Sequence, residues 1–387
     1  MGYIDVDTHV LECEQTWEYM DPSEAHYKPR IMDLQGEVGD IATGKSLWLT
    51  GDGWARRWPA DGRPSGYGKT FSGNVTYLED PAERLRDMDE LGVDAQIVIS
   101  TFFIGIESAH PLEMAALTRS WNRWVAERTA DAGGRLRWLG TVPLMHRERA
   151  FEELAFMKEH GAAGVMIHGF PYEMYLNDPW FYPIYERAQD LDLTVGVHLG
   201  APVRIIPNLP IGNLVPTPPA FLDHAVTNMK GMHAILSSDL SERFPRLRWA
   251  FLESGATWVP AIIQQHQRLI SLASPEGFPM TERGTTANVT RIDGPKLMAE
   301  KNVYVACETD EDLPYLAGLL GEDCLMFGSD YCHNDIGADP FGHTIIAGRD
   351  DVKPELAEKI TSTNARKAFG IPLDFQPASV AARKLSA

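Results

Sequence analysis

Short apolar runs with the character of β-strands alternate with longer amphipathic segments along almost the whole chain. The predicted strands cover residues 3–7, 94–100, 136–144, 163–168, 193–198, 247–253, 302–308 and 325–330. The predicted helices cover residues 81–91, 112–131, 147–160, 180–191, 221–244, 259–272, 313–320 and 354–369. Each strand is therefore followed by a helical segment before the next strand begins.

This alternation predicts a parallel sheet, and eight strands favour an α/β fold closed as a (β/α)8 TIM barrel. An open, doubly wound sheet is the structural alternative. A nucleotide-binding version of that alternative has no support, because no G-x-G-x-x-G follows the first strand and no P-loop is present.

Three segments interrupt the alternation. Residues 12–78 are long, rich in Gly, Pro and Trp, and without clear periodicity, and residues 201–220 and 273–300 are further insertions. The first follows a strand end, which places it over the C-terminal mouth of a barrel, so we interpret it as a cap. Residues 201–220 would form a second lid. No clean linker divides the chain, and we expect residues 1–387 to form a single domain with long loops.

Composition and charge limit the classes of molecule that this protein is expected to bind. The chain has 387 residues, 44% of them hydrophobic, and a formal net charge of −19. This charge argues against nucleic acid and anionic membrane surfaces as partners. No run approaches the roughly 18 apolar residues of a membrane span, and the N-terminal sequence lacks the layout of a signal peptide. Four cysteines without C-x-x-C spacing indicate reduced thiols, and we expect a cytoplasmic protein.

Polar side chains with metal-binding capacity stand at the ends of several predicted strands. They are Asp7, His9, His168, His198, Glu253 and Asp330. Each one alone is more often a turn or helix-capping residue. In barrel enzymes, however, the C-terminal strand ends meet at one mouth, where carboxylates and imidazoles would repel or desolvate one another unless a cation neutralised them. Mixed nitrogen and oxygen ligands predict a divalent ion.

The spacing of polar residues supports an inward orientation for some of these side chains. Asp7 and His9 are two residues apart and share one face of a strand. In the fifth predicted strand, Thr194, Gly196 and His198 share the face with the smaller side chains, which we expect to turn into the barrel. Buried parallel strands are apolar on both faces, so this spacing alone does not decide the orientation.

These motifs resemble a known family. The D-x-H at residues 7–9, the histidine ending the fifth strand, "FPRLRWAFLESGATWVP" and "FGSDYCHND" are similar to motifs of the amidohydrolase superfamily. The similarity is greatest to the branch that contains aminocarboxymuconate semialdehyde decarboxylase and γ-resorcylate decarboxylase. It implies a (β/α)8 barrel that binds a divalent metal ion, commonly zinc or manganese and sometimes iron. The ligands it implies are Asp7, His9, His198 and Asp330.

One position departs from the family pattern. Where decarboxylases of this branch carry a sixth-strand histidine that acts as acid or base, this chain has Glu253. A glutamate does not donate a proton at neutral pH unless burial raises its pKa. We therefore interpret Glu253 as an additional metal ligand or a base, which disfavours simple decarboxylation. His168 could help Glu253 hold a second metal, or it could be a hydrogen-bonded residue of the mouth.

The chemistry that we predict is hydrolysis of an ester, thioester or amide by a metal-activated water. Asp330 or Glu253 would take the proton of the water. The metal, or a nearby donor such as His168 or His333, would polarise the substrate carbonyl. The alternatives are a lyase, either a non-oxidative decarboxylase or a hydratase, and a non-catalytic binding barrel.

Aromatic residues near the mouth indicate a hydrophobic or ring-containing small-molecule substrate. They include Trp54 and Trp58 in the cap, and Phe170 and Tyr172 after the fourth strand; alternatively, these side chains hold the long loops on the barrel. Arg204 could pair with a substrate carboxylate or phosphate. His224 is a further candidate for substrate contact. Analogy with the family suggests a homodimer.

Overall fold

The computed structural model describes residues 2–33, 46–51, 53–57, 70–200, 218–272, 291–333 and 337–377. For residues 56, 218–224 and 271–272 it describes only the backbone. Predictions that concern other residues lie outside the described part of the chain.

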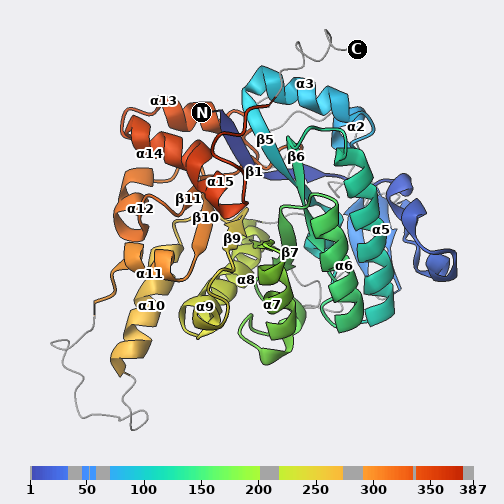
Figure 1. Ribbon diagram of the computed structural model, residues 1–387, viewed down its shortest axis with the longest axis horizontal. Coiled ribbons are helices and arrows are strands. Elements are labelled where there is room, and N and C mark those ends of the chain that lie inside the picture. The colour runs from blue at the N-terminus through green and yellow to red at the C-terminus, as the bar shows by residue number, and fades with distance from the viewer. Residues whose placement is uncertain are drawn as a thin grey trace.

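Eight parallel strands form one sheet in which the strands follow one another in sequence order. They are β1 (Tyr3–Val10), β5 (Val93–Ser100), β6 (Leu136–Thr141), β7 (Gly164–His168), β8 (Thr194–His198), β9 (Trp249–Leu252), β10 (Val303–Cys307) and β11 (Leu325–Phe327). Each of the eight predicted strands is confirmed, with ends that differ by a few residues. Figure 1 shows the strands at the centre of the molecule with helices around them.

The first and last strands meet, which closes the barrel. The backbone N–H of His9 donates to the Tyr331 carbonyl at 2.8 Å, and that of Tyr331 donates to the Asp7 carbonyl at 3.4 Å. The Ser329 backbone N–H donates to Asp5 Oδ1 at 3.0 Å. The fold is therefore a (β/α)8 TIM barrel, and the open-sheet alternative is excluded.

The helices that cover the barrel also follow the prediction closely. They are α3 (Pro81–Leu91), α5 (Pro111–Thr129), α6 (Arg147–Glu159), α7 (Tyr182–Asp190), α8 (Pro218–Leu236), α9 (Leu240–Arg243), α10 (Val259–Leu272), α11 (Gly294–Glu300), α12 (Leu313–Leu320), α13 (Gly342–Gly348), α14 (Pro354–Glu358) and α15 (Asn364–Ala368). Two of these helices, α11 and α13, were not predicted, and two predictions merged separate elements. The predicted helix 221–244 is α8 followed by α9, and the predicted helix 354–369 is α14 and α15 joined by the π-helical turn Lys359–Thr363.

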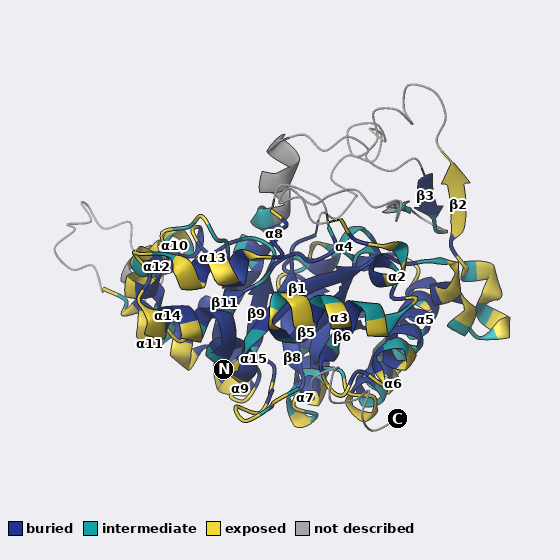
Figure 2. Cartoon of the chain, turned by 90° about the horizontal axis from the view of Figure 1, so that it is seen from above, coloured by how far each residue is buried: buried dark blue, intermediate teal, exposed yellow. Residues whose placement is uncertain are grey.

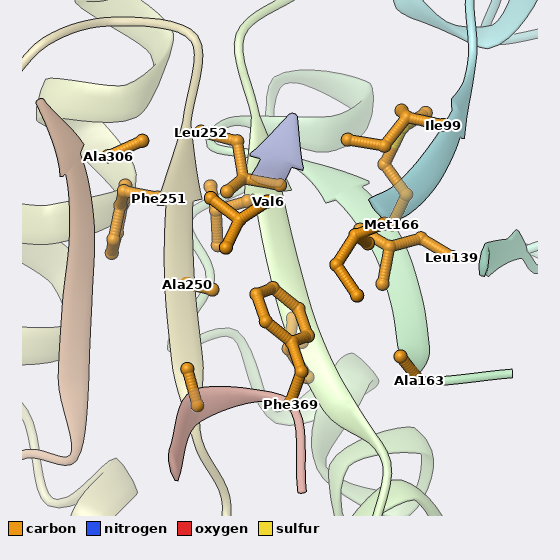
Figure 3. Close-up of a cluster of buried hydrophobic side chains, with 14 of the residues drawn as sticks. Val6, Ile99, Leu139, Ala163, Met166, Ala250, Phe251, Leu252, Ala306 and Phe369 are labelled. Atoms are coloured by element: carbon orange, nitrogen blue, oxygen red, sulfur yellow. The ribbon is translucent and has the colours of Figure 1, made fainter. Parts of the chain in front are cut away.

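Close packing across the barrel interior explains the small residue in β8. A Cβ atom added to Gly196 would lie 2.6 Å from Leu139 of β6 and 3.5 Å from Leu252 of β9. The predicted inward face of this strand is thus confirmed, because the bulky neighbours fill the space in front of Gly196. Figure 3 shows Val6, Leu139 and Phe369 among the side chains that fill the interior.

The segment interpreted as a cap contains short regular elements. A three-stranded antiparallel sheet consists of β2 (Arg30–Asp33), β3 (Ser46–Leu49) and β4 (Trp54–Arg57). β4 packs on the short helix α4 (Phe102–Gly105), which directly follows barrel strand β5. Figure 2 shows β2 and β3 to the side of the barrel proper. Strands of four residues are too short for the period-2 pattern to be legible in the sequence, so the prediction missed them.

A tryptophan joins this small sheet to the barrel. The Trp17 ring lies 6.0 Å from Trp48 of β3 and 4.8 Å from Phe102 of α4, measured between ring centroids. Both contacts are edge-to-face, the geometry that aromatic pairs prefer. The small sheet is thereby fixed at the C-terminal end of the barrel strands.

The other two predicted insertions fall mostly outside the described residues. Of the second lid, only residues 218–220 are described, where α8 begins, and of the third insertion only residues 291–300, which include α11. Among the described helices, none combines the length and the apolar character needed to cross a bilayer.

Candidate metal centre

The first strand carries two of the predicted ligands, Asp7 and His9. The register of β1 on β5 shifts between Asp5 and Thr8, an irregularity of the kind that re-aims side chains near active sites. Arg84 of α3 anchors the strand, because its guanidinium donates to the His9 carbonyl at 2.7 Å. His9 is fully buried, and Asp7 is almost so.

The other predicted ligands come from three further strand ends. His198 is the last residue of β8, Glu253 directly follows β9, and Asp330 lies shortly after β11. Glu253 and Asp330 have left-handed backbone conformations, with φ of 52° and 51°. Such a conformation costs about 1–3 kcal/mol in a residue other than glycine and is concentrated at functional sites.

The folded chain brings these side chains together. His9 Nε2 lies 3.1 Å from Asp7 Oδ1, 3.3 Å from Glu253 Oε2 and 3.4 Å from Asp330 Oδ1. His198 Nε2 lies 2.9 Å from Glu253 Oε2 and 3.3 Å from His9 Nε2. Potential ligand atoms of Asp7, His9, His198 and Glu253 all lie within 4.8 Å of one another, and so do those of His9, Glu253, Asp330 and His333.

The donor set fits a divalent cation. Asp7 Oδ1 and Glu253 Oε2 are buried and accept no hydrogen bond of regular geometry from the described residues. A buried carboxylate oxygen without a donor is costly, and a cation would remove that cost. Two imidazoles combined with carboxylates suit zinc, manganese or iron, and the share of oxygen ligands is higher than zinc sites usually have.

The charges within the cluster shift its pKa values strongly. Burial by itself lowers the pKa of His198, but the neighbouring Glu253 and Asp7 outweigh burial and raise this pKa to about 10. The same carboxylates raise the pKa of His9 against burial. Conversely, burial favours a higher pKa for Asp7 and Glu253, but the two imidazoles hold the pKa of Asp7 below its usual value and that of Glu253 well below it. Protons on the imidazoles thus neutralise carboxylate charge when no cation does so.

His333 lies beside the cluster, in contact with two of its members. Its Nδ1 lies 2.6 Å from Asp330 Oδ1, and its ring stacks on that of His9 at 4.0 Å. Its Nε2 lies 2.9 Å from the Thr101 hydroxyl. Burial and the charge of His9 lower the pKa of His333 to about 3. Contact of His333 with the substrate stays a prediction.

His168, predicted as a catalytic residue, belongs to neither group of potential ligands. Its Nδ1 lies 2.9 Å from Glu107 Oε1, and its Nε2 lies 2.9 Å from the Phe103 carbonyl oxygen. Glu107 also accepts a hydrogen bond from the Tyr172 backbone N–H at 2.9 Å. This geometry matches the alternative of a hydrogen-bonded mouth residue, and the catalytic role of His168 stays a prediction.

The aromatic side chains predicted to bind substrate contact neighbouring loops. Phe170 packs edge-to-face against Tyr175 at 5.0 Å, and the Lys230 ammonium lies 3.9 Å from the Phe170 ring centre. The Tyr172 hydroxyl donates to the Ser108 carbonyl at 3.2 Å. Trp54 is half-buried in β4. Trp58, Arg204 and the side chain of His224 lie outside the described residues.

Glu308 is a carboxylate of the mouth that was not among the residues predicted from the sequence. It directly follows β10, so the strand-end rule that selected the other residues applies to it as well. Burial, the charge of Glu311 and the charges of Asp7 and Glu253 raise the pKa of Glu308 to about 8. Thr101 and Glu107 were also overlooked, because they lie in the loop after β5 and their roles depend on contacts distant in sequence.

Comparisons with known proteins agree with this geometry. The family model described as Amidohydrolase matches residues 4–371. A 2-amino-3-carboxymuconate-6-semialdehyde decarboxylase from Dictyostelium discoideum is 23% identical over 267 residues, which cover 68% of this chain and 70% of that protein.

Two solved structures show the same fold. An amidohydrolase from Mycobacterium avium subsp. paratuberculosis K-10 superimposes with a TM-score of 0.74 at 20% identity, over 97% of this chain and 99% of the other. A dihydroxybenzoic acid decarboxylase from Polaromonas sp. JS666, solved with bound manganese and the inhibitor 2-nitroresorcinol, gives a TM-score of 0.61 at 17% identity, over 96% and 97%. The family match, which spans nearly the whole chain, shows that this protein belongs to the amidohydrolase family and confirms the predicted resemblance to its decarboxylase-containing branch.

Proposed function

We propose that this chain catalyses the metal-dependent, non-oxidative decarboxylation of an aromatic or otherwise conjugated carboxylic acid. The observation that carries the proposal is the cluster of buried imidazoles and carboxylates at the barrel mouth, in a chain that is similar to several named decarboxylases. Two such relatives are named for their substrates, an aminocarboxymuconate semialdehyde and a dihydroxybenzoic acid, and both substrates are conjugated acids.

In this proposal Asp7, His9, His198 and Asp330 hold the metal ion, with Glu253 as a further ligand. His9 and Glu253 belong to both groups of potential ligands, whereas Asp330 belongs only to the group that contains His333. When bound, a divalent cation supplies Lewis-acid polarisation of the substrate oxygens. Manganese is bound in one of the decarboxylases with this fold, and the oxygen-rich donor set suits it. Non-catalytic use of the barrel has less support, because buried carboxylates are costly to keep without a cation.

Decarboxylation requires a proton at the carbon atom that loses CO₂. Glu253 occupies the position where the family pattern has a histidine, and its pKa lies well below the usual value, so it is a poor proton donor. We assign the donor role to Glu308, whose pKa of about 8 keeps its carboxyl group protonated at neutral pH. Burial is the largest cause of that raised pKa, followed by the charge of Glu311.

Hydrolysis, the main prediction from the sequence, is the second candidate. Its specific support is Glu253, which as a carboxylate could take a proton from water, as a hydrolytic reaction requires. The named relatives support decarboxylation better. A small-molecule substrate is common to both candidates, and the homodimer stays a prediction.

Substrate panels distinguish the two candidates. Protein loaded with manganese or zinc is incubated with hydroxybenzoates and conjugated dicarboxylates, and CO₂ release and the decarboxylated product are measured. A parallel panel contains esters, thioesters and amides. CO₂ release from an acid supports the proposal, whereas cleavage of an ester, thioester or amide without CO₂ release from any acid would overturn it.

A further inference from the structure

We infer that Thr101 and His333 form a chain of polar contacts that orients two of the proposed metal ligands, His9 and Asp330. The inference rests on the proposed metal site and deepens it. Thr101 and His333 are positioning residues: their side chains contact the metal ligands but do not themselves bind the metal.

The distances trace a continuous path between the two ligands. His9 Nδ1 lies 3.4 Å from Thr101 Oγ1, Thr101 Oγ1 lies 2.9 Å from His333 Nε2, and His333 Nδ1 lies 2.6 Å from Asp330 Oδ1. The ring planes of His9 and His333 are inclined by only 17°, with centres 4.0 Å apart. The two rings therefore stack, and the Thr101 hydroxyl bridges one nitrogen of each.

The register of the barrel strands places Thr101 at this point. His9 of β1 lies opposite Ile99 of β5, and Thr101 is the first residue after β5. Its backbone N–H donates to the Val10 carbonyl at 3.3 Å. The Thr101 hydroxyl is therefore held next to His9 by pairing between the first two strands of the barrel.

The chemistry of the groups fixes the direction of each hydrogen bond. A carboxylate only accepts hydrogen bonds, so His333 Nδ1, which lies 2.6 Å from Asp330 Oδ1, faces that oxygen with a hydrogen. A neutral His333 with this hydrogen on Nδ1 has a lone pair on Nε2, and that atom, 2.9 Å from Thr101 Oγ1, accepts the Thr101 hydroxyl proton. The Thr101 oxygen is then left to accept from His9 Nδ1–H.

This direction has a consequence for metal binding. A neutral imidazole that carries its hydrogen on Nδ1 has a lone pair on Nε2, and His9 Nε2 is the atom that faces Asp7 and Glu253. The contacts through Thr101 and His333 thus hold His9 in the tautomer whose Nε2 can bind a cation. It also holds the Asp330 carboxylate in one orientation. Groups of this kind, in contact with ligands but not with the metal, typically account for a 10- to 100-fold difference in metal affinity.

The test is a pair of substitutions at Thr101 that differ in the hydroxyl. Thr101→Val keeps the branched shape and removes the hydroxyl, whereas Thr101→Ser keeps the hydroxyl and removes a methyl group. Zinc affinity is measured by competition with a chromophoric chelator, on full-length protein. We expect Thr101→Val to bind zinc about 10- to 100-fold more weakly than wild type and Thr101→Ser to remain within about threefold. Thermal unfolding of the metal-free variants shows that they are folded.

A second measurement tests whether the two residues act as one chain. His333→Phe keeps the stacked ring and removes both nitrogens. If Thr101 and His333 act in series, the double variant Thr101→Val with His333→Phe binds zinc no more weakly than the weaker single variant. Nitrogen-15 shifts of the zinc-loaded wild type should show His9 with a hydrogen on Nδ1 and the metal on Nε2.

Three results would overturn the inference: equal zinc affinity of Thr101→Val and wild type, equal loss in Thr101→Ser and Thr101→Val, or additive losses in the double variant. Failure of the wild type to bind zinc or manganese would be a different outcome. That result would contradict the proposed metal site itself, and the positioning role of Thr101 and His333 depends on that site.

Discussion

Glu253 Oε2 lies 2.9 Å from His198 Nε2, and each of the two residues stabilises the charged form of the other. The two residues end neighbouring strands of the barrel, β8 and β9. Because a divalent cation would take the place of the proton on His198, binding of metal and binding of protons compete at this site.

We therefore expect metal binding to release protons. The pKa of His198 is raised to about 10 in the metal-free protein, so the imidazole keeps its proton below that pH and must lose it to bind a cation. Calorimetric titration with zinc or manganese in two buffers of different ionisation enthalpy should show release of about one to two protons. Affinity should increase as the pH rises from 6 to 9. Binding without proton release would contradict the assignment of His198 as a ligand.

Asp330→Asn tests the proposed metal ligand that follows β11, the last strand of the barrel. The amide keeps the shape and an acceptor oxygen for His333 but loses the charge that binds the cation. We expect metal affinity to fall by more than about 100-fold, beyond the loss typical of groups outside the ligand set, with decarboxylation abolished. The thermal unfolding of the metal-free variant should match the wild type. Asp310→Asn, at an exposed position, is the matched control. Retention of full activity in Asp330→Asn would refute its role.

Glu308→Gln tests the proposed proton donor. The pKa of Glu308 is raised to about 8, so activity that requires its protonated form should decline as the pH rises through that value. The glutamine variant should lose about 100-fold or more of its turnover and should no longer show this decline. Exposed Glu300→Gln serves as the control. An unchanged pH profile in Glu308→Gln would exclude Glu308 as the donor.

His168→Gln tests whether the fourth barrel strand contributes to metal binding. Both nitrogens of His168 already contact Glu107 and the Phe103 carbonyl, and the residue lies in neither group of potential ligands. We expect the metal affinity and the number of ions per chain to be unchanged within about twofold. Loss of one of two bound ions would instead support a second metal site shared by His168 and Glu253.

Glu12→Gln should change how stability depends on pH. Glu12 accepts hydrogen bonds from the Ser100 hydroxyl and the Phe102 backbone N–H, and burial raises its pKa from 4.5 to about 7 in spite of them. The folded state therefore binds this proton more tightly than the unfolded state. The stabilising effect of the proton is complete below about pH 4.5 and is lost as the pH rises to about 7.

The shift in the pKa of Glu12 from 4.5 to about 7 corresponds to a loss of on the order of 3 kcal/mol in the free energy of unfolding between low and high pH. Urea denaturation of metal-free protein at pH 5 and pH 8 measures it. The fall in stability between these two pH values should be smaller in Glu12→Gln than in wild type. An equal fall in both proteins would show that other groups carry the pH dependence.

Local sequence pattern was sufficient to predict the barrel and most of the proposed ligand set. Short stretches of neighbouring residues are enough to reveal the alternation of strands and helices. The parallel strands of a barrel all end at the same mouth. The strand-end rule therefore groups Asp7, His9, His168, His198, Glu253 and Asp330 on sequence alone. The folded chain brings all of these except His168 into the two overlapping groups of potential ligands. The same rule applies to Glu308, which also follows a strand.

Only the tertiary structure decided which side chains meet within the mouth. Thr101 reaches His333, and His168 pairs with Glu107, through loops and strand registers that no local pattern encodes. The left-handed backbone of Glu253 and Asp330 likewise results from packing around them and not from local preference. Periodicity is a property of neighbouring residues, whereas hydrogen-bond partners, burial and the resulting pKa values depend on contacts between residues far apart in the chain, and these exist only once the barrel has closed.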